Sequence, residues 1–175
     1  VKPYRIITTA SADVPLKGLK FLIEAMPAII QTIPEAHLIV IGKAKKEGKI
    51  LKKISSLNLQ GKISFHSGLS QVELVSLYSS SQISVIPSLY EGFGFGAGEA
   101  MSCELPLIST SSGGLKEVIG QDAVEIESSS SEAIASAVKE LFADEEKQHS
   151  LSRLGRKRME NEFNWMKAAK GYEEI

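Results

Sequence analysis

Apolar and polar residues follow two different periods along the chain. Short, nearly continuous apolar runs predict β-strands, and they cover residues 4–9, 37–41, 62–65, 83–87, 107–110 and 123–126. Elsewhere the apolar residues recur every three or four positions, which predicts α-helices at residues 17–31, 45–57, 70–78, 99–103, 115–119, 130–142 and 145–163. Strands that alternate with helices predict an α/β fold: a Rossmann-like, doubly wound parallel sheet of about six strands with helices on both faces.

The succession of elements shows no internal repeat and no linker, so we expect residues 1–175 to form a single domain. Pro27 lies inside the first predicted helix and should kink or shorten it, because proline removes one backbone hydrogen bond. Residues 164–175 begin a further helical pattern that stops at Ile175, and the chain opens at Val1 on a predicted core strand. We therefore expect a domain excised from a longer protein, with a truncated last helix.

Composition narrows the classes of partner and compartment. The 20 basic and 21 acidic side chains leave a formal net charge of -1, so bulk electrostatics favour no nucleic-acid partner, and a small-molecule ligand fits better. The single cysteine, Cys103, cannot form an intrachain disulfide, which is compatible with a reducing compartment. No apolar run approaches the roughly 18 to 20 residues that a membrane-spanning helix needs. We expect a cytoplasmic protein.

One stretch carries the strongest chemical signal. Four glycines alternate along residues 92–98, between Glu91 and Glu99, just after the predicted strand 83–87. Ligands of an open parallel sheet bind beyond the carboxyl ends of its strands, and a helix N-terminus offers N–H groups to phosphate. The two carboxylates are suited to accept hydrogen bonds from sugar hydroxyls. The alternative is that Glu99 only balances the helix dipole and Glu91 is solvated. The glycines favour the ligand site, because they cost stability unless the backbone needs unusual angles or a close approach.

The same stretch resembles the Glu-x7-Glu signature of family 4 retaining glycosyltransferases, which have the two-domain GT-B fold. The resemblance extends over essentially the whole chain, through the segments Lys17-Gly18, Leu22-Ile-Glu-Ala25, 37–42, Leu105-Pro106, Gly113-Gly114, Glu117-Val-Ile119 and Phe163-Asn-Trp165. It implies that residues 1–175 are the C-terminal, donor-binding half of such an enzyme. The N-terminal domain, which would bind most of the acceptor, is then absent from this sequence.

The resemblance also implies roles for single residues. Glu91 would contact hydroxyls of the donor sugar, and Lys17 would neutralise the departing nucleoside diphosphate; these are the two candidate catalytic residues. Glu99 would hold the ribose hydroxyls, and Leu69 would lie near the base. The amides of Gly94 and Phe95 would contact the diphosphate. Gly92 and Phe93, in the same loop, are the remaining candidate donor-binding residues.

The implied function is transfer of a hexose from a nucleoside-diphosphate sugar to an acceptor, with retention of configuration and without a metal or another cofactor. This fragment alone would bind the donor without turning it over. Two alternatives stay open: a non-catalytic nucleotide-sugar binding module, and a GT-B sugar-nucleotide epimerase.

Three positions depart from the family pattern. Ser11 and Ala12 stand where relatives usually carry an arginine, so one phosphate-binding cation is missing. Glu104 replaces a glycine that is common after the helix. Gly96 and Gly98 replace larger residues and should weaken the first helical turn. We expect weaker donor binding or an altered phosphate contact.

Other chemistries have less support. Gly92-x-Gly94-x-x-Ala97 satisfies the dinucleotide fingerprint, but it does not follow the first strand, and no acidic residue ends the next strand. No Asp-x-Asp pair or cluster of histidines indicates a metal site. The basic clusters at 43–53 and 153–158 are first interpreted as solvated helix faces. A peripheral contact of the full-length protein with the inner face of a membrane is the second interpretation.

Overall fold

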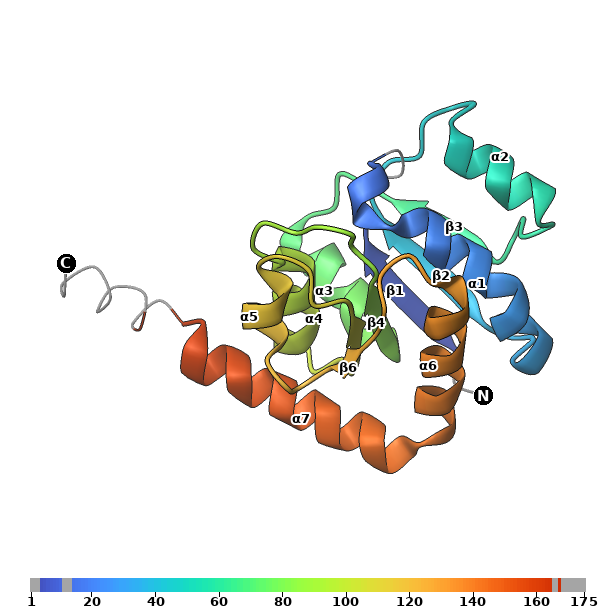
Figure 1. The fold of residues 1–175 in the computed structure, drawn as a ribbon. Coiled ribbons are helices and arrows are strands. Elements are labelled where there is room, and N and C mark those ends of the chain that lie inside the picture. Colours follow the sequence, from blue (N-terminus) through green and yellow to red (C-terminus); the bar gives the residue numbers. More distant parts are fainter. Residues whose placement is uncertain (1–3, 11–13, 165–166, 168–175) are drawn as a thin grey trace.

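The computed structural model describes residues 4–10, 14–164 and 167 (Figure 1). Six parallel strands form one sheet in the order β3-β2-β1-β4-β5-β6. The strands are β1 (Arg5–Thr9), β2 (His37–Ile41), β3 (Ile63–His66), β4 (Ile83–Ile86), β5 (Leu107–Ser109) and β6 (Val124–Glu125). The predicted Rossmann-like α/β fold is confirmed.

Helices cover both faces of the sheet. They are α1 (Leu19–Thr32), α2 (Lys49–Ser56), α3 (Gln71–Ser79), α4 (Phe95–Ser102), α5 (Leu115–Ile119), α6 (Ser131–Ala143) and α7 (Glu145–Glu162), with a 3-10 turn, η1 (Pro15–Lys17), after β1. Figure 1 shows α1 and α6 together on one side of the sheet and α3, α4 and α5 on the other. On each face, a layer of buried side chains packs between the sheet and the helices, as a doubly wound fold requires.

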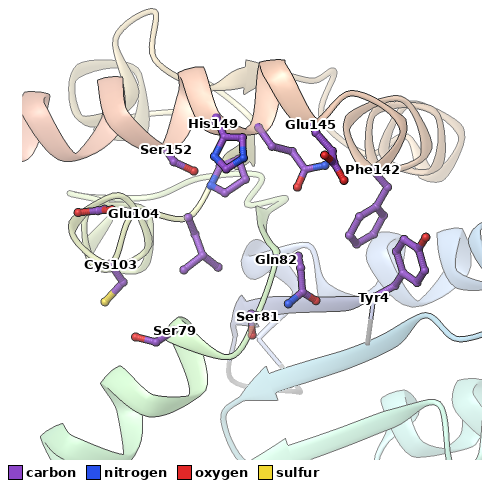
Figure 2. Close-up of a pocket in the computed structure, with 13 residues that line it drawn as sticks. Tyr4, Ser79, Ser81, Gln82, Cys103, Glu104, Phe142, Glu145, His149 and Ser152 are labelled. Atoms are coloured by element: carbon purple, nitrogen blue, oxygen red, sulfur yellow. The ribbon is translucent and has the colours of Figure 1, made fainter. Parts of the chain in front are cut away.

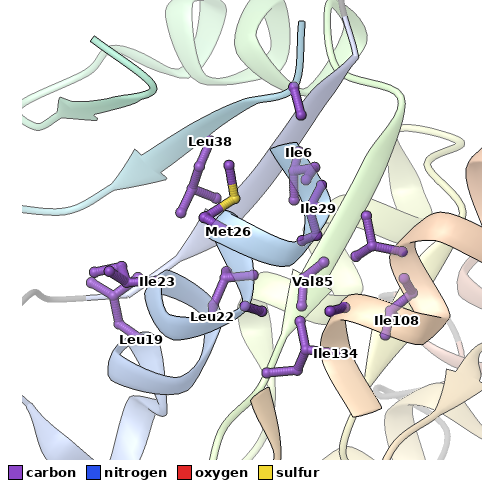
Figure 3. Packing of buried hydrophobic residues seen from close by; sticks show 14 of the residues in the cluster. Ile6, Leu19, Leu22, Ile23, Met26, Ile29, Leu38, Val85, Ile108 and Ile134 are labelled. Atoms are coloured by element: carbon purple, nitrogen blue, oxygen red, sulfur yellow. The ribbon is translucent and has the colours of Figure 1, made fainter. Parts of the chain in front are cut away.

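Neighbouring residues of each strand contribute to opposite layers, because side chains alternate across a strand. Ile6 belongs to the cluster that α1 and α6 cover, which Figure 3 shows with Leu22 and Ile134. Ile7 belongs to the cluster under α4 and α5. Both residues are fully buried, so the central strand is apolar on both faces, as its continuous apolar run predicts.

The strand order places a switch point in the middle of the sheet. From β1 the chain builds outward through β2 to β3, and it then returns to the other side of β1 to form β4. The connections that leave β1 and β4 therefore diverge at the carboxyl edge of the sheet, which is where ligands of such sheets bind. The segments 14–18 and 87–95 meet at this switch point.

Pro27 does not shorten the first helix. α1 continues five residues beyond it, to Thr32. Met26 and Ile29 of this helix are completely buried, and each buried side chain of that size contributes about 1.5–3 kcal/mol. That is enough to offset the roughly 3 kcal/mol cost of an interior proline.

Two predicted helix boundaries were wrong. The helix expected at 45–57 begins only at Lys49, because Glu47 has a left-handed φ of 62° and Gly48 is extended at the N-cap. The helix expected from Glu99 begins at Phe95, so two glycines lie inside it. The predicted helix at 164–175 falls almost entirely outside the described residues, as do Ser11 and Ala12. Within the described segments, no helix combines the length and the apolar character that crossing a membrane requires.

Candidate functional site

Lys17 and Glu91 meet at the switch point. Lys17 ends the 3-10 turn after β1, and Glu91 lies in the loop after β4; the Lys17 Nζ to Glu91 Oε2 distance is 2.6 Å. The side chains are 33% and 16% exposed, so the pair is reachable by a ligand. The Ser88 hydroxyl lies 3.4 Å from the same carboxylate oxygen and donates to it. The structure thus brings together the two predicted catalytic residues, which are 74 positions apart in sequence.

Gly18 allows this approach. Its φ is +66°, and a Cβ atom there would lie 1.9 Å from the carbonyl oxygen of Pro87. The adjoining backbone segments are also joined by the Leu89 amide, which donates to the Leu16 carbonyl at 2.8 Å. Since only glycine has no Cβ and tolerates this φ at low cost, the turn before α1 can touch the loop after β4 only with glycine here.

Gly113 and Gly114 hold the Glu91 loop from the other side. The Gly114 amide donates to the Glu91 carbonyl at 2.8 Å. A Cβ at Gly113 would lie 2.3 Å from that carbonyl, and one at Gly114 would lie 2.3 Å from the carbonyl of Gly92. The loop is therefore clamped by backbone contacts on both sides.

The N-terminus of α4 faces the same edge. Gly94 is its N-cap with φ 100°; no side chain caps the helix, and its first turn carries no acidic residue. The positive end of the helix dipole thus has no anionic side chain of its own there. Phe93 and Phe95 flank Gly94 and are 47% and 72% exposed, with ring centroids 4.8 Å apart.

Glu99 does not sit in the first turn of α4, so it does not act as a first-turn partner for the helix dipole. It lies one turn further along, where its Oε2 accepts a hydrogen bond from the Tyr78 hydroxyl at 2.9 Å. The Tyr78 oxygen is in turn 2.8 Å from Thr9 Oγ1. Burial, and secondarily the neighbouring Glu99, raises the pKa of Tyr78 above its usual range. The sequence reasoning missed Tyr78, because it ends an apolar helix face and resembles an ordinary core residue.

Leu69 is the remaining residue predicted to contact the donor. Leu69 is half-buried in the turn between β3 and α3, at the same edge of the sheet. No hydrogen bond among the described residues joins it to Glu91 or Glu99. In the described part of the chain, no three His, Cys, Asp or Glu side chains gather closely enough to hold a metal ion.

Two cavities have Cys103 in common among the residues that line them. One, of about 880 Å³, borders the site: its walls include Tyr78, Phe93, Phe95 and Glu99, with side chains of α3 and α7. The other, of about 460 Å³, is lined by α7 residues and by the segments that precede the strands (Figure 2). The segments 81–82 and 105–106 of its wall precede β4 and β5, so this cavity opens toward the amino edge of the sheet.

The basic cluster at 153–158 is not simply a solvated face. Arg156 donates to the carbonyl of Ser102 at 2.6 Å. Arg158 donates to the carbonyls of Val118 and Glu117, at 2.8 and 2.6 Å. These arginines bind the last carbonyls of α4 and α5, which favour cations, and so attach α7 to the site helices. The interpretation as a solvated face was wrong for these two residues.

The strand order and the helices on both faces of the sheet define a Rossmann-like α/β domain. More narrowly, the chain belongs to the family of glycosyl transferases group 1, whose sequence model matches residues 1–158.

Similar proteins span more than this chain. It is 34% identical over 168 residues to an MMP alpha-(1->4)-mannosyltransferase of Mycolicibacterium hassiacum, covering 94% of this chain and 41% of that protein. It is 28% identical over 155 residues to a glycogen synthase of Mycobacterium tuberculosis, covering 87% of this chain and 37% of that protein. Among solved structures, the C-terminal domain of a glycosyl transferase group 1 family protein from Francisella tularensis superposes with a TM-score of 0.79 at 26% identity, over 91% of this chain and 86% of that one. The chain thus spans about two fifths of the length of these curated relatives.

Proposed function

We propose that residues 1–175 are the donor-binding domain of a retaining, metal-independent glycosyltransferase of family 4. Glu91 contacts hydroxyls of the donor sugar, Lys17 binds the diphosphate, and Glu99 binds the ribose. The amides of Gly94 and Phe95, with Gly92 and Phe93, hold the phosphates, and Leu69 lies near the base. An N-terminal domain outside this sequence binds the acceptor.

The observation that carries this proposal is the Lys17–Glu91 pair at the switch point. The Lys17 ammonium group and the Glu91 carboxylate lie 2.6 Å apart and pair with each other. A bound diphosphate competes for the ammonium group and frees the carboxylate to accept from sugar hydroxyls. The ammonium group then stabilises the charge that grows on the leaving diphosphate, which needs no metal ion.

The uncapped N-terminus of α4 supports the phosphate contact. Its first-turn N–H groups and dipole favour an anion, and no acidic side chain in that turn opposes it. Because Ser11 and Ala12 stand where relatives usually carry an arginine, these backbone donors have a larger share of phosphate binding in this chain.

Calorimetry with UDP, GDP and ADP, and with their mannose and glucose esters, tests donor binding. The mannose esters come first, because one relative is named a mannosyltransferase. We expect binding of at least one nucleotide. No binding at millimolar concentration by any of them would contradict the proposal.

Substitution in the full-length protein tests the catalytic roles. We expect Lys17→Met and Glu91→Gln to lower kcat by about 10²–10³, as loss of one electrostatic group at a reacting centre does. Lys20→Met is the matched control. The Lys20 side chain is 59% exposed, and its Nζ atom makes a long ion pair of 3.9 Å with Oε1 of Glu24 in the same helix.

The same experiment separates the two alternatives. A non-catalytic module, which the sequence at Ser11 and Ala12 favours, would bind the nucleotide but release no nucleoside diphosphate with any acceptor. An epimerase would form product without an acceptor. A cytoplasmic location, with peripheral attachment of the full-length protein to the inner face of a membrane, is part of the proposal and is checked by fractionating cells.

A further inference from the structure

Three side chains from three elements form a directed hydrogen-bond chain at the edge of the site. Thr9 ends β1, Tyr78 lies in the last turn of α3, and Glu99 is in α4. The Tyr78 oxygen is 2.8 Å from Thr9 Oγ1 and 2.9 Å from Glu99 Oε2. A carboxylate only accepts, so the single phenolic proton points to Glu99, and the phenolic oxygen accepts the proton of Thr9.

Burial holds the hydrogen-bonded side chains of Thr9, Tyr78 and Glu99 in place. Tyr78 is 1% exposed and among the largest fully buried side chains, so its ring cannot move aside. Because burial raises the pKa of its hydroxyl, Tyr78 remains a donor throughout the physiological range. A buried hydroxyl that lost its partner would cost about 1–3 kcal/mol, which holds the Glu99 carboxylate in one orientation.

Gly96 allows α4 to approach Thr9 at the end of β1. A Cβ atom at Gly96 would lie 3.0 Å from Thr9 Cβ and 3.1 Å from Thr9 Oγ1. These distances are shorter than ordinary contacts. The helix α4 can therefore pack this closely against the end of β1 because residue 96 has no side chain. This explains a glycine that weakens the first helical turn.

We propose that Tyr78, supported by Thr9, is a positioning residue that orients Glu99 toward the hydroxyls of the donor ribose. The inference rests on the proposed function, in which Glu99 binds the ribose. With Oε2 held by Tyr78, the other carboxylate oxygen faces the ligand in a fixed direction. The network therefore sets the preference for a ribonucleotide over its 2′-deoxy analogue.

The test measures this preference by calorimetry on the full-length protein. The probes are UDP, GDP and ADP, each paired with its 2′-deoxy counterpart. A hydrogen bond from a ribose hydroxyl to an oriented carboxylate corresponds to about a tenfold to hundredfold preference in the wild type. We expect Tyr78→Phe to reduce this ratio by about tenfold while leaving the affinity for the 2′-deoxy probe unchanged.

A merely structural role would lower both affinities together. Tyr4→Phe is the matched control: it deletes the same hydroxyl from a ring that packs against Phe142, at the opposite edge of the sheet. If Tyr78→Phe does not fold, Thr9→Val carries the test, because it removes only the donor to the phenol; a reduction of about threefold is expected.

The remaining possible results contradict the positioning role, the ribose contact or the proposed function, as follows. An unchanged ratio in a folded Tyr78→Phe, or in Thr9→Val where only that variant folds, overturns the positioning role alone. Equal binding of ribo and deoxy probes by the wild type overturns both the ribose contact of Glu99 and this inference. Failure of all six probes to bind the wild type overturns this inference, and failure of the mannose and glucose esters as well overturns the proposed function itself.

Discussion

Replacing Gly18 with alanine tests whether a backbone contact assembles the site. The new Cβ would lie 1.9 Å from the Pro87 oxygen and 2.8 Å from its carbonyl carbon, whereas ordinary contacts begin at 3.4 Å. The two loops must separate by more than 1 Å, which strains the Leu89 to Leu16 hydrogen bond. The left-handed φ costs about 1 kcal/mol, and overpacking against rigid backbone adds about 1–3 kcal/mol. We expect a total loss of about 2–4 kcal/mol in the free energy of unfolding.

Gly61→Ala is the matched control for this measurement. Gly61 has a similar φ of +79°, but a Cβ there would meet nothing within 4 Å, so it reports the cost of the left-handed φ alone, about 1 kcal/mol. Urea unfolding followed by circular dichroism gives both values. With a slope of about 2 kcal/mol per molar urea, the midpoint should fall by about 1–2 M for Gly18→Ala and by about 0.5 M for Gly61→Ala. Equal losses for the two variants would refute the contact argument.

Three further changes should be measurable by urea unfolding. Ser70→Ala removes the N-cap of α3, where Ser70 accepts from the Glu73 amide and Glu73 accepts from Ser70, and should cost about 1 kcal/mol; a loss below 0.3 kcal/mol would show that the capping box is not formed. Glu104→Gly should stabilise by about 0.5–1 kcal/mol, because it relieves a left-handed φ of 57° just after α4; a destabilised variant would contradict this. Burial, with help from Arg5, lowers the pKa of His37, so the unfolded state binds more protons just below pH 6.5. Stability should then fall as the pH drops below about 6.5, by at most about 1.4 kcal/mol per pH unit for one proton, and the slope should become shallower in His37→Asn.

The fold could be predicted from sequence because its signals are local. Apolar runs, helical periods and glycines at strand ends are each visible within about ten residues. The Glu91 to Glu99 stretch was recognisable for the same reason, since strand, glycine loop and helix follow one another directly. The start of α4 was predicted wrongly, at Glu99 and not at Phe95, because Gly96 and Gly98 are poor helix formers.

What the sequence did not show depends on contacts between distant residues. The ion pair of Lys17 and Glu91 joins residues 74 positions apart. The hydrogen bond from Tyr78 to Glu99 joins two helices, and no local pattern distinguishes a core tyrosine from one that orients a carboxylate. Arg158 likewise seemed solvated, because its partners are carbonyl groups of a helix 40 residues earlier.

The clamp around the Glu91 loop consists of backbone atoms and glycines, not of the side chains that would meet a ligand. Its geometry therefore does not depend on which side chains occupy positions 17 and 91. Substitutions there can change the reactivity of the domain while the loop keeps its shape. Such a division makes this edge of the sheet a suitable place for directed evolution of ligand preference, provided that Gly18, Gly113 and Gly114 are kept constant.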